Sequence, residues 1–339
     1  MAEATVDSIG EDGLIELFAI EAGSLGGKVI VPNGDDAAAY FVEPKYVTVV
    51  TTDSQVEGVH FDLAYTPPNV VGRKLVSVNV SDIAAMGATS RYALLAVSIP
   101  PSTTVETAKR IALGIRDVCK ANGVAIIGGN TTTIDGPIVL TITLIGRAEP
   151  SQLVRRRGTL VGDAIYVTGH LGDARAGLEV ARAGPPPEHD DPRYPLFSAL
   201  IDPVVRPRAG RKLGETQLAH AMCDVSDGFS RDLRRLLEPE GLGARIEGSA
   251  LPVSEALASY ADAMHRDPIP IALAGGEDYE LLFTADPNAE DQIAQLCANA
   301  GTPVARVGVV TARHDIEVRL PSGEVVELPS GFEHYRPGS

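Results

Sequence analysis

Tryptophan is absent from the sequence, and cysteine is scarce: Cys119, Cys223 and Cys297 are the only three among 339 residues. They are odd in number, far apart and without a Cys-x-x-Cys spacing, which argues against a disulfide framework and against a zinc site. The pattern favours three core thiols in a reducing compartment, so we expect a cytoplasmic protein.

Long apolar runs are missing as well. No basic segment followed by an apolar one opens the chain, and no apolar run approaches the roughly 20 residues of a membrane-spanning helix. We therefore expect a soluble protein that has no membrane partner.

Basic residues are few relative to acidic ones. The chain has 29 Lys and Arg against 45 Asp and Glu, a formal net charge of −16. This balance disfavours a nucleic acid or an anionic membrane as the main partner. If the substrates are anions, bound divalent cations are the obvious means of neutralising them, because clustered carboxylates repel phosphate.

The two familiar nucleotide-binding motifs are also lacking. The segment AGSLGGKV has Ala22 where a P-loop has its first glycine and Val29 where it has Ser or Thr. No Gly-x-Gly-x-x-Gly follows a strand and opens a helix, so a dinucleotide-binding fingerprint is missing too.

The length of the chain favours two domains, since it exceeds what one hydrophobic core usually supports. We place the boundary after Pro150, where an apolar strand gives way to the basic connector Arg155-Arg156-Arg157. The predicted domains are residues 1–150 and 151–339. The three arginines form either a solvated surface or, through one of them, a contact to an anion.

The first acidic motifs lie near the start of the chain. Val47 to Val50 is typical of a buried strand, and Thr51, Thr52 and Asp53 follow it directly. Oxygen ligands in this position suit a hard cation such as Mg²⁺, although Asp and Ser in a surface turn would give a similar pattern. Asp36, beside another aspartate and after a glycine, is open to the same two interpretations.

Similar acids recur along the chain. Asp82 lies in an apolar helix predicted over residues 67–88, either as part of an N-terminal cap or as a metal ligand. In the second half, Asp224, Ser226 and Asp227 stand between a strand and a helix predicted over residues 229–237. Glu277 follows two glycines before an apolar strand.

The remaining pattern predicts alternating strands and helices. Strands are expected over residues 92–99, 124–127, 138–145, 164–168 and 304–310, with further paired strands up to residue 328. Helices are expected over residues 8–21, 103–122, 172–183 and 286–300, with a capping box at the start of the second of these. The glycines after residue 127 predict a turn whose backbone could face phosphate, and the proline-rich segment 184–195 predicts an exposed loop.

Together these acids describe two sets of oxygen ligands that could hold several Mg²⁺ ions between the two domains. Phosphoryl transfer needs such an arrangement, because both reacting groups are negative and catalysis consists mainly of positioning and charge neutralisation.

Six motifs in this order carry a resemblance to a known family: GDDAA, TTD…EGVHF, VNVSDIAAMGA, GGNTT, DVSDG…DL and GGEDYELLF. The sequence resembles the thiamine-monophosphate kinases, of the superfamily of aminoimidazole-ribonucleotide synthetase, selenophosphate synthetase and the hydrogenase-maturation dehydratase. The resemblance implies a two-domain PurM-like α+β fold. Its N-terminal α/β domain has a mixed sheet that joins a second copy in a barrel, and its C-terminal domain is an α/β sandwich that completes the active-site cleft.

The activity implied is ATP-dependent phosphorylation of thiamine monophosphate to thiamine diphosphate by direct in-line transfer, with several Mg²⁺ ions, no nucleophilic side chain and a homodimeric enzyme. The resemblance implies that the metal ligands are Asp36, Thr51, Thr52, Asp53, Asp82, Asn130, Asp224 and Asp227. ATP would contact Gly129, Asn130, Arg156 and Ser226. Thiamine monophosphate would contact His60, Glu277 and Phe332, with the packed core imidazole as the alternative for His60.

One residue departs from the family pattern. The family has GGDT where this chain has Asn130, which keeps a carbonyl oxygen but lacks the charge. We expect one Mg²⁺ to bind more weakly and turnover to fall without being lost. Two alternatives remain open: another ATP-using enzyme of the superfamily with a different acceptor, and an ATP-binding homologue with impaired catalysis.

Overall fold

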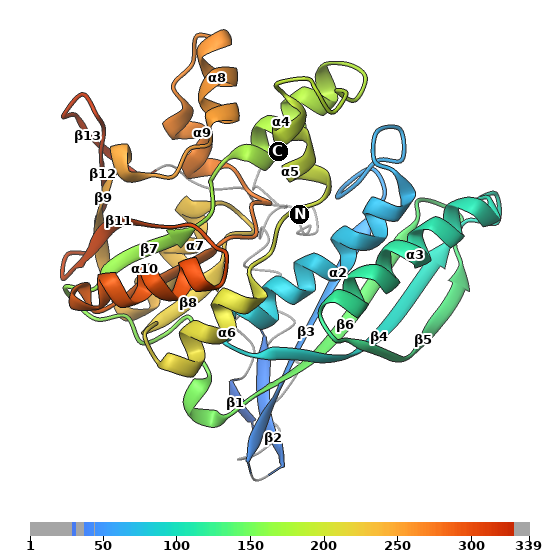
Figure 1. The fold of residues 1–339 in the computed structure, drawn as a ribbon, viewed down its shortest axis with the longest axis horizontal. Coiled ribbons are helices and arrows are strands. Elements are labelled where there is room, and N and C mark those ends of the chain that lie inside the picture. The colour runs from blue at the N-terminus through green and yellow to red at the C-terminus, as the bar shows by residue number, and fades with distance from the viewer. Residues whose placement is uncertain (1–28, 32–36, 44, 329–339) are drawn as a thin grey trace, which may run out of the picture.

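The computed structural model describes residues 29–31, 37–43 and 45–328. Two β-sheets, each with helices packed against it, account for this part of the chain (Figure 1). The first sheet has six strands in the order β1-β2-β3-β6-β4-β5, and the second has seven in the order β13-β12-β9-β11-β7-β10-β8. The predicted α+β fold with a mixed N-terminal sheet is confirmed.

The first sheet draws all its strands from the N-terminal half of the chain. Most neighbours are antiparallel, and only β4 and β5 run parallel. The bounds are β1 (Val29–Val31), β2 (Ala38–Glu43), β3 (Tyr46–Val56), β4 (Thr89–Ile99), β5 (Ala125–Thr133) and β6 (Val139–Ala148).

Two strands are longer than the sequence indicated. β3 does not end at Val50 but continues through Asp53, because its whole length pairs with β6. β5 includes Gly128 and Asn130, so the turn predicted there is wrong: the segment pairs in parallel with β4. The polar residues of both motifs therefore belong to strands.

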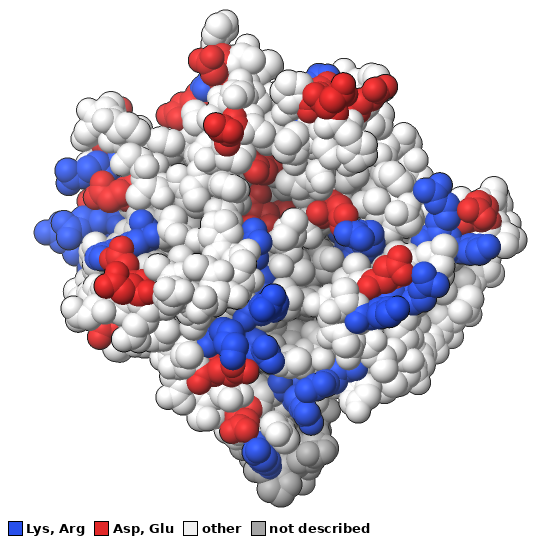
Figure 2. Space-filling model, in the orientation of Figure 1, with Lys and Arg blue, Asp and Glu red and all other residues white. Residues whose placement is uncertain are grey.

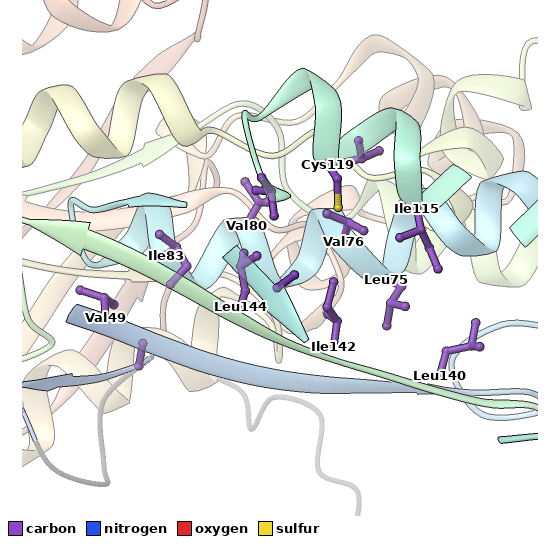
Figure 3. Close-up of a cluster of buried hydrophobic side chains, with 14 of the residues drawn as sticks. Val49, Leu75, Val76, Val80, Ile83, Ile115, Cys119, Leu140, Ile142 and Leu144 are labelled. Atoms are coloured by element: carbon purple, nitrogen blue, oxygen red, sulfur yellow. The ribbon is translucent and has the colours of Figure 1, made fainter. Parts of the chain in front are cut away.

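Helices α2 (Pro68–Ala85) and α3 (Val105–Ala121) cover one face of this sheet, as Figure 1 shows. The side chains of Leu75 and Ile83 on α2 point toward those of the sheet, whereas Val76 and Val80 point toward α3, where Val76 lies beside Cys119 (Figure 3). α2 is buried along most of its length because it packs on the sheet, on α3 and on the second half of the chain.

Two glycines set the distance between α2 and α3. A Cβ on Gly72 would overlap the carbonyl oxygen of Ile111, and one on Gly114 would overlap that of Asn69. Only glycine permits this approach from both sides. The close contact fixes α2, which carries Lys74 and Asp82, against the rest of the N-terminal half.

The second sheet is also mixed, since β9 and β12 are parallel and its other neighbours antiparallel. Its strands are β7 (Ala164–Thr168), β8 (Ala221–Asp224), β9 (Gly243–Glu247), β10 (Leu281–Ala285), β11 (Val304–Thr311), β12 (Ile316–Arg319) and β13 (Val325–Glu327). Its helices are α4 (Asp173–Ala183), α5 (Tyr194–Ile201), α6 (Pro207–Thr216), α7 (Phe229–Leu237), α8 (Glu255–Ala263), α9 (Pro268–Ala274) and α10 (Glu290–Asn299).

The two halves share a core. Ala85 of α2 packs in a cluster with residues of the second sheet, including Tyr166 and Phe283, whose rings stack 5.3 Å apart. A Cβ on Gly210 of α6 would overlap the carbonyl oxygen of Ala84. Side chains from the two halves are therefore held in fixed positions relative to each other.

Glu280 forms a buried ion pair in the second half. Arg206 holds its carboxylate with two nitrogens, and Thr168 donates a third hydrogen bond at 2.6 Å. The two charged side chains are only 14% and 6% exposed. Such a bidentate pair compensates for the cost of burying the carboxylate.

Several predicted elements are confirmed within a residue or two, namely the strands over 164–168 and 304–310 and the helices over 172–183 and 229–237. The capping residue of α3 is Thr104, one position later than predicted. The helix predicted over residues 8–21 lies outside the described residues. In the described ranges, no helix is long and apolar enough to cross a membrane.

Candidate active site

A cavity of about 1050 Å³ lies between the two halves. Its walls come from β3 and the loop after it, from α2, from the connector at Arg156, from α4, and from loops of the second half around residues 226 and 276. Acidic side chains are visible within the hollow at the centre of the molecular face in Figure 2. The cavity is the natural candidate for the active site.

Asp53 and Asp82 form the acidic wall on the N-terminal side. Thr51 donates a hydrogen bond of 2.7 Å to Asp82, and the two aspartates are hydrogen-bonded through their side chains. Burial raises the pKa of Asp53 to about 6, the bond with Asp82 opposes this shift, and the charge of Asp227 adds to it. Two carboxylates so close together repel each other unless a proton or a cation lies between them.

Asp82 lies in the last turn of α2, so the N-terminal cap that the sequence left open is excluded. It reaches β3 because α2 crosses the face of the sheet that carries Thr51 and Asp53. The intervening Thr52 points to the opposite face. There its hydroxyl donates a hydrogen bond to the carbonyl oxygen of Ile142 and accepts one from the hydroxyl of Thr143. All three strand residues line the cavity, but the pleat separates Thr52 from the other two.

The loop after β8 supplies the opposite wall. Ser226 and Asp227 line the cavity, whereas Asp224 is buried beneath it at 2% exposure. Asp227 is paired with Arg235 at 2.7 Å and with Arg231 at 3.6 Å, both from α7. A carboxylate and two guanidinium groups therefore stand together at this wall.

The loop of residues 275–280 completes the wall beside Asp227. Its backbone is held to the loop after β8 by bonds from the nitrogens of Glu277 and Tyr279 to carbonyls of Ser226 and Val225, 2.7 and 2.8 Å long. Glu277 and Tyr279 have positive φ angles of 67° and 50°. Such angles are uncommon for side-chain-bearing residues and persist where the surroundings fix them, often at functional sites.

Side chains of this loop face in two directions. Glu277 and Tyr279 line the cavity. Asp278 points away and accepts hydrogen bonds from the backbone nitrogens of Gly172 and Ala174 at the start of α4, so it is structural. Burial raises the pKa of Tyr279 well above its usual value, and four carboxylates, beginning with Glu277, add to the effect. The Tyr279 phenol is therefore a neutral group in an acidic environment.

His60 lines the cavity on the N-terminal side. Its Nδ1 accepts a hydrogen bond of 3.1 Å from the backbone nitrogen of Val56, which leaves the ring proton on Nε2. The ring is thereby fixed by its own loop, as expected for a side chain that presents one nitrogen as a donor.

Arg156 is the only one of the three connector arginines that lines the cavity, while Arg155 and Arg157 are exposed. The carbonyl oxygen of Arg155 accepts a hydrogen bond of 2.9 Å from the backbone nitrogen of Met222, which holds the connector beside β8, and the chain bends at Arg156. The prediction that one arginine of the three faces an anion site is thus consistent with its position.

Gly129 and Asn130 are not brought to this cavity. They lie on β5, an exposed edge strand, and Gly129 stands in one row with Leu95, Ile142 and Asp53 across four strands. Three strand spacings separate its backbone from that of Asp53, which amounts to about 14 Å. Asp36 and Phe332 lie outside the described residues.

The oxygen ligands fit Mg²⁺. The described ranges contain no ready-made group of three or more His, Cys, Asp or Glu side chains at metal-binding distance. Mg²⁺ usually takes one or two carboxylates together with waters and substrate phosphates rather than a cage of protein ligands alone. The hydrogen-bonded pair of Asp53 and Asp82, with its raised pKa, provides such a partial site.

Sequence reasoning missed Tyr279, Arg231 and Arg235. The tyrosine lies within GGEDYELLF, where only the acidic residues were considered as site residues. The arginines lie in the first two turns of the helix predicted over residues 229–237, to which no functional role was assigned. Their role becomes visible because α7 starts directly after Asp227 and its first turns face back toward that carboxylate.

Comparisons with known proteins agree over both halves. Residues 34–148 match the family described as AIR synthase related protein, N-terminal domain, and residues 161–321 match its C-terminal domain. The thiamine-monophosphate kinase of Rhodopirellula baltica is 35% identical over 91% of this chain and 92% of its own. The thiamine-monophosphate kinase of Aquifex aeolicus is 36% identical over 96% of this chain and 98% of its own.

Solved structures give the same result. One described as "AaThiL complexed with AMPPCP and TMP" is 31% identical, covers 99% of this chain and 100% of its own, and superposes with a TM-score of 0.85. A hydrogenase maturation protein, HypE, shares the fold at 19% identity over 89% of this chain and 93% of its own, with a TM-score of 0.72.

Proposed function

This chain belongs to the thiamine-monophosphate kinase family, and from that premise we propose how its cavity performs the reaction. The enzyme is a phosphotransferase that uses ATP to convert thiamine monophosphate into thiamine diphosphate. One observation carries the assignment to the cavity: acids of β3 and α2 face Ser226, Asp227 and Glu277 of the second half across a space of about 1050 Å³.

The reaction joins two anions, so the cavity must reduce their repulsion. An oxygen of the acceptor phosphate forms a bond to the γ-phosphorus of ATP while the bond to the β,γ-bridging oxygen breaks and ADP leaves. A phosphate oxygen is already an adequate nucleophile near neutral pH, so no side chain needs to remove a proton. What the chain supplies is alignment and positive charge.

Mg²⁺ would be held on the N-terminal side by Asp53 and Asp82, with the Thr51 hydroxyl beside them, and on the opposite side by Asp227. When bound, it neutralises phosphate charge and orients the oxygens of both substrates. We include Asp36, Thr52, Asp224 and Asn130 as further ligands, as the resemblance implies. The close pair of Asp53 and Asp82 supports the placement of Mg²⁺ on the N-terminal side, because a cation relieves the repulsion between the two carboxylates.

The phosphates of ATP would lie near Arg156 and Ser226, which border the cavity beside Asp227. Arg156 suits this task because a guanidinium donates two parallel bonds to phosphate oxygens. The acceptor would lie toward His60 and Glu277. The Glu277 carboxylate complements the thiazolium cation of thiamine monophosphate, and Nε2 of His60 carries the ring proton, which makes it a hydrogen-bond donor.

We further propose that a second copy completes the site. Tyr92 and Leu94 on β4, with Ile126 and Ile127 on β5, are 41–59% exposed on or beside the open face of the first sheet. An exposed apolar group of this kind, next to the strand at the edge of the sheet as far as the structure describes it, is typical of an interface. In a dimer formed through this face, Gly129 and Asn130 of one copy would contribute to the cavity of the other copy.

A cytoplasmic location is part of the proposal. Cys119, Cys223 and Cys297 are all buried thiols outside any disulfide, which is the state expected where thiols stay reduced.

Product formation tests the proposed function. The purified chain with ATP, Mg²⁺ and thiamine monophosphate should yield thiamine diphosphate and ADP in equal amounts, and free thiamine should not replace the monophosphate. ATP consumption without diphosphate would indicate a different acceptor, and ATP binding without turnover would indicate an impaired homologue.

A further inference from the structure

Lys74 is the one lysine of α2 and is almost completely buried, at 1% exposure. It does not line the cavity but lies directly behind its wall. A buried ammonium is costly unless its hydrogens all find acceptors and its charge finds a partner, so its contacts indicate what it is held there to do.

Three acceptors surround the ammonium. Its nitrogen lies 2.9 Å from Oε2 of Glu277, 3.0 Å from the carbonyl oxygen of Leu200 and 3.2 Å from that of His60. An ammonium has three hydrogens, so its capacity is used in full. One of the three acceptors carries a charge, which balances that of Lys74.

The acceptors come from three separate segments. His60 lies in the loop after β3, Leu200 in α5, and Glu277 in the strained loop before β10. All three residues line the cavity. Lys74 therefore joins, from behind, one lining residue of the N-terminal half to two of the C-terminal half.

We propose that Lys74 is a positioning residue for the thiamine end of the cavity, an inference that rests on the proposed function. Its ammonium holds Oε2 of Glu277, so that the other carboxylate oxygen faces the substrate, and it fixes the His60 loop at the matching distance. It touches neither substrate. Without it, Glu277 is an unpaired carboxylate that turns toward water, and the loop loses its anchor to the second half.

The neighbouring residue offers a matched control. Arg73, also on α2, forms an ion pair with Asp202 at 2.9 Å, again between the two halves, but neither residue lines the cavity. Arg73→Met removes an ion pair between the same two halves at the C-terminal end of α5, and it leaves the contacts of Lys74 to His60, Leu200 and Glu277 in place. It separates a specific effect of Lys74 from a general loosening of the two halves.

The test compares Lys74→Met, Arg73→Met and the wild type in steady-state kinetics, varying each substrate with the other saturating. Lys74→Met should raise the KM for thiamine monophosphate by roughly 10- to 100-fold, since displacement of a positioning group by about 1 Å costs that much. The KM for ATP should stay close to the wild-type value. Arg73→Met should change neither KM. Equal increases in both KM values for Lys74→Met, or the same increase for Arg73→Met, would overturn the proposal.

A double variant covers the case in which Lys74→Met does not fold. In Lys74→Met with Glu277→Gln, no buried charge is left unpaired. If Lys74 acts mainly through Glu277, the double variant should exceed the KM for thiamine monophosphate of Glu277→Gln by clearly less than about 10-fold, a remainder that reflects the lost anchor of the His60 loop. A further increase of about 10-fold or more would mean that the two residues act independently.

Calorimetric binding of thiamine monophosphate, measured without ATP, keeps this inference separate from the proposed function. A wild type that binds the monophosphate but forms no diphosphate contradicts the proposed function alone. Equal affinities of the wild type and Lys74→Met contradict the role of Lys74.

Discussion

Asp53→Asn should make the metal-free protein more stable while removing its activity. The pKa of Asp53 rises from 3.8 to about 6, first because of burial and also because of the charge of Asp227. The folded protein therefore holds this proton at a higher pH than the unfolded chain does. Above pH 6 the carboxylate is ionised in both states, and the folded state bears the full cost of its charge.

The pKa difference sets the size of the effect. One pKa unit corresponds to about 1.4 kcal/mol, so ionised Asp53 lowers the free energy of unfolding by up to about 3 kcal/mol. The cost is absent below pH 4, grows as the pH rises toward 6, and stays constant above it. Asparagine keeps a hydrogen-bonding partner for Asp82 but has no charge to bury.

Urea unfolding of the wild type and Asp53→Asn, in EDTA at several values between pH 5 and pH 8, measures this difference. The variant should be more stable at pH 8, and its advantage should shrink toward pH 5. Asp135→Asn, in the exposed turn between β5 and β6, should stay within about 0.5 kcal/mol of the wild type throughout. Adding Mg²⁺ should stabilise the wild type more than Asp53→Asn. Parallel pH curves for the wild type and Asp53→Asn would refute this reasoning.

Three further changes probe other parts of the account. Arg206→Met leaves the buried carboxylate of Glu280 without its cation and should lower the free energy of unfolding by about 3–5 kcal/mol, whereas Arg193→Met, which breaks an exposed pair, should leave the midpoint of the same urea titration nearly unchanged. Asn130→Asp should lower the Mg²⁺ concentration needed for half-maximal turnover, and an unchanged Mg²⁺ dependence would count against Asn130 as a ligand. Leu94→Lys should shift the mass measured by light scattering from dimer to monomer, while Val204→Lys, at another exposed apolar position, should leave it unchanged; a dimer in both variants would place the interface elsewhere.

The sequence indicated which acidic residues would lie together, but it did not indicate how their side chains are arranged. Asp53, Asp82, Ser226, Asp227 and Glu277 all border one cavity, although they are spread over more than two hundred positions. Their residue types and their places beside apolar segments singled them out, because a buried carboxylate needs a specific reason to be there. That they bind metal or substrate stays a prediction. The ordered motifs of the family added the expected roles.

The pairing of β-strands determined features of the fold that the local sequence pattern did not predict. β3 continues through its polar residues because β6 pairs with it along its whole length, which a local composition rule cannot detect. The glycines before Asn130 signalled a turn, yet strand pairing with β4 overrides that preference. The pleat then turns Thr52 away from Thr51 and Asp53, a separation that follows only once the register is known.

Lys74 could not be identified from the sequence because its partners are distant in the chain. His60, Leu200 and Glu277 lie 14, 126 and 203 positions away. A single lysine in an apolar helix is a local anomaly, but only the arrangement of both halves shows what it binds. The same holds for Arg235, whose link to Asp227 depends on where α7 begins.

The most direct test of the central claim is the rate of thiamine diphosphate formation by the wild type and Asp82→Asn, measured side by side at saturating Mg²⁺, ATP and thiamine monophosphate. Asp82 joins α2 to the ligands of β3, so the variant should fold normally yet lose activity by about 100-fold or more. A variant that forms the diphosphate at the wild-type rate would show that the chemistry takes place elsewhere.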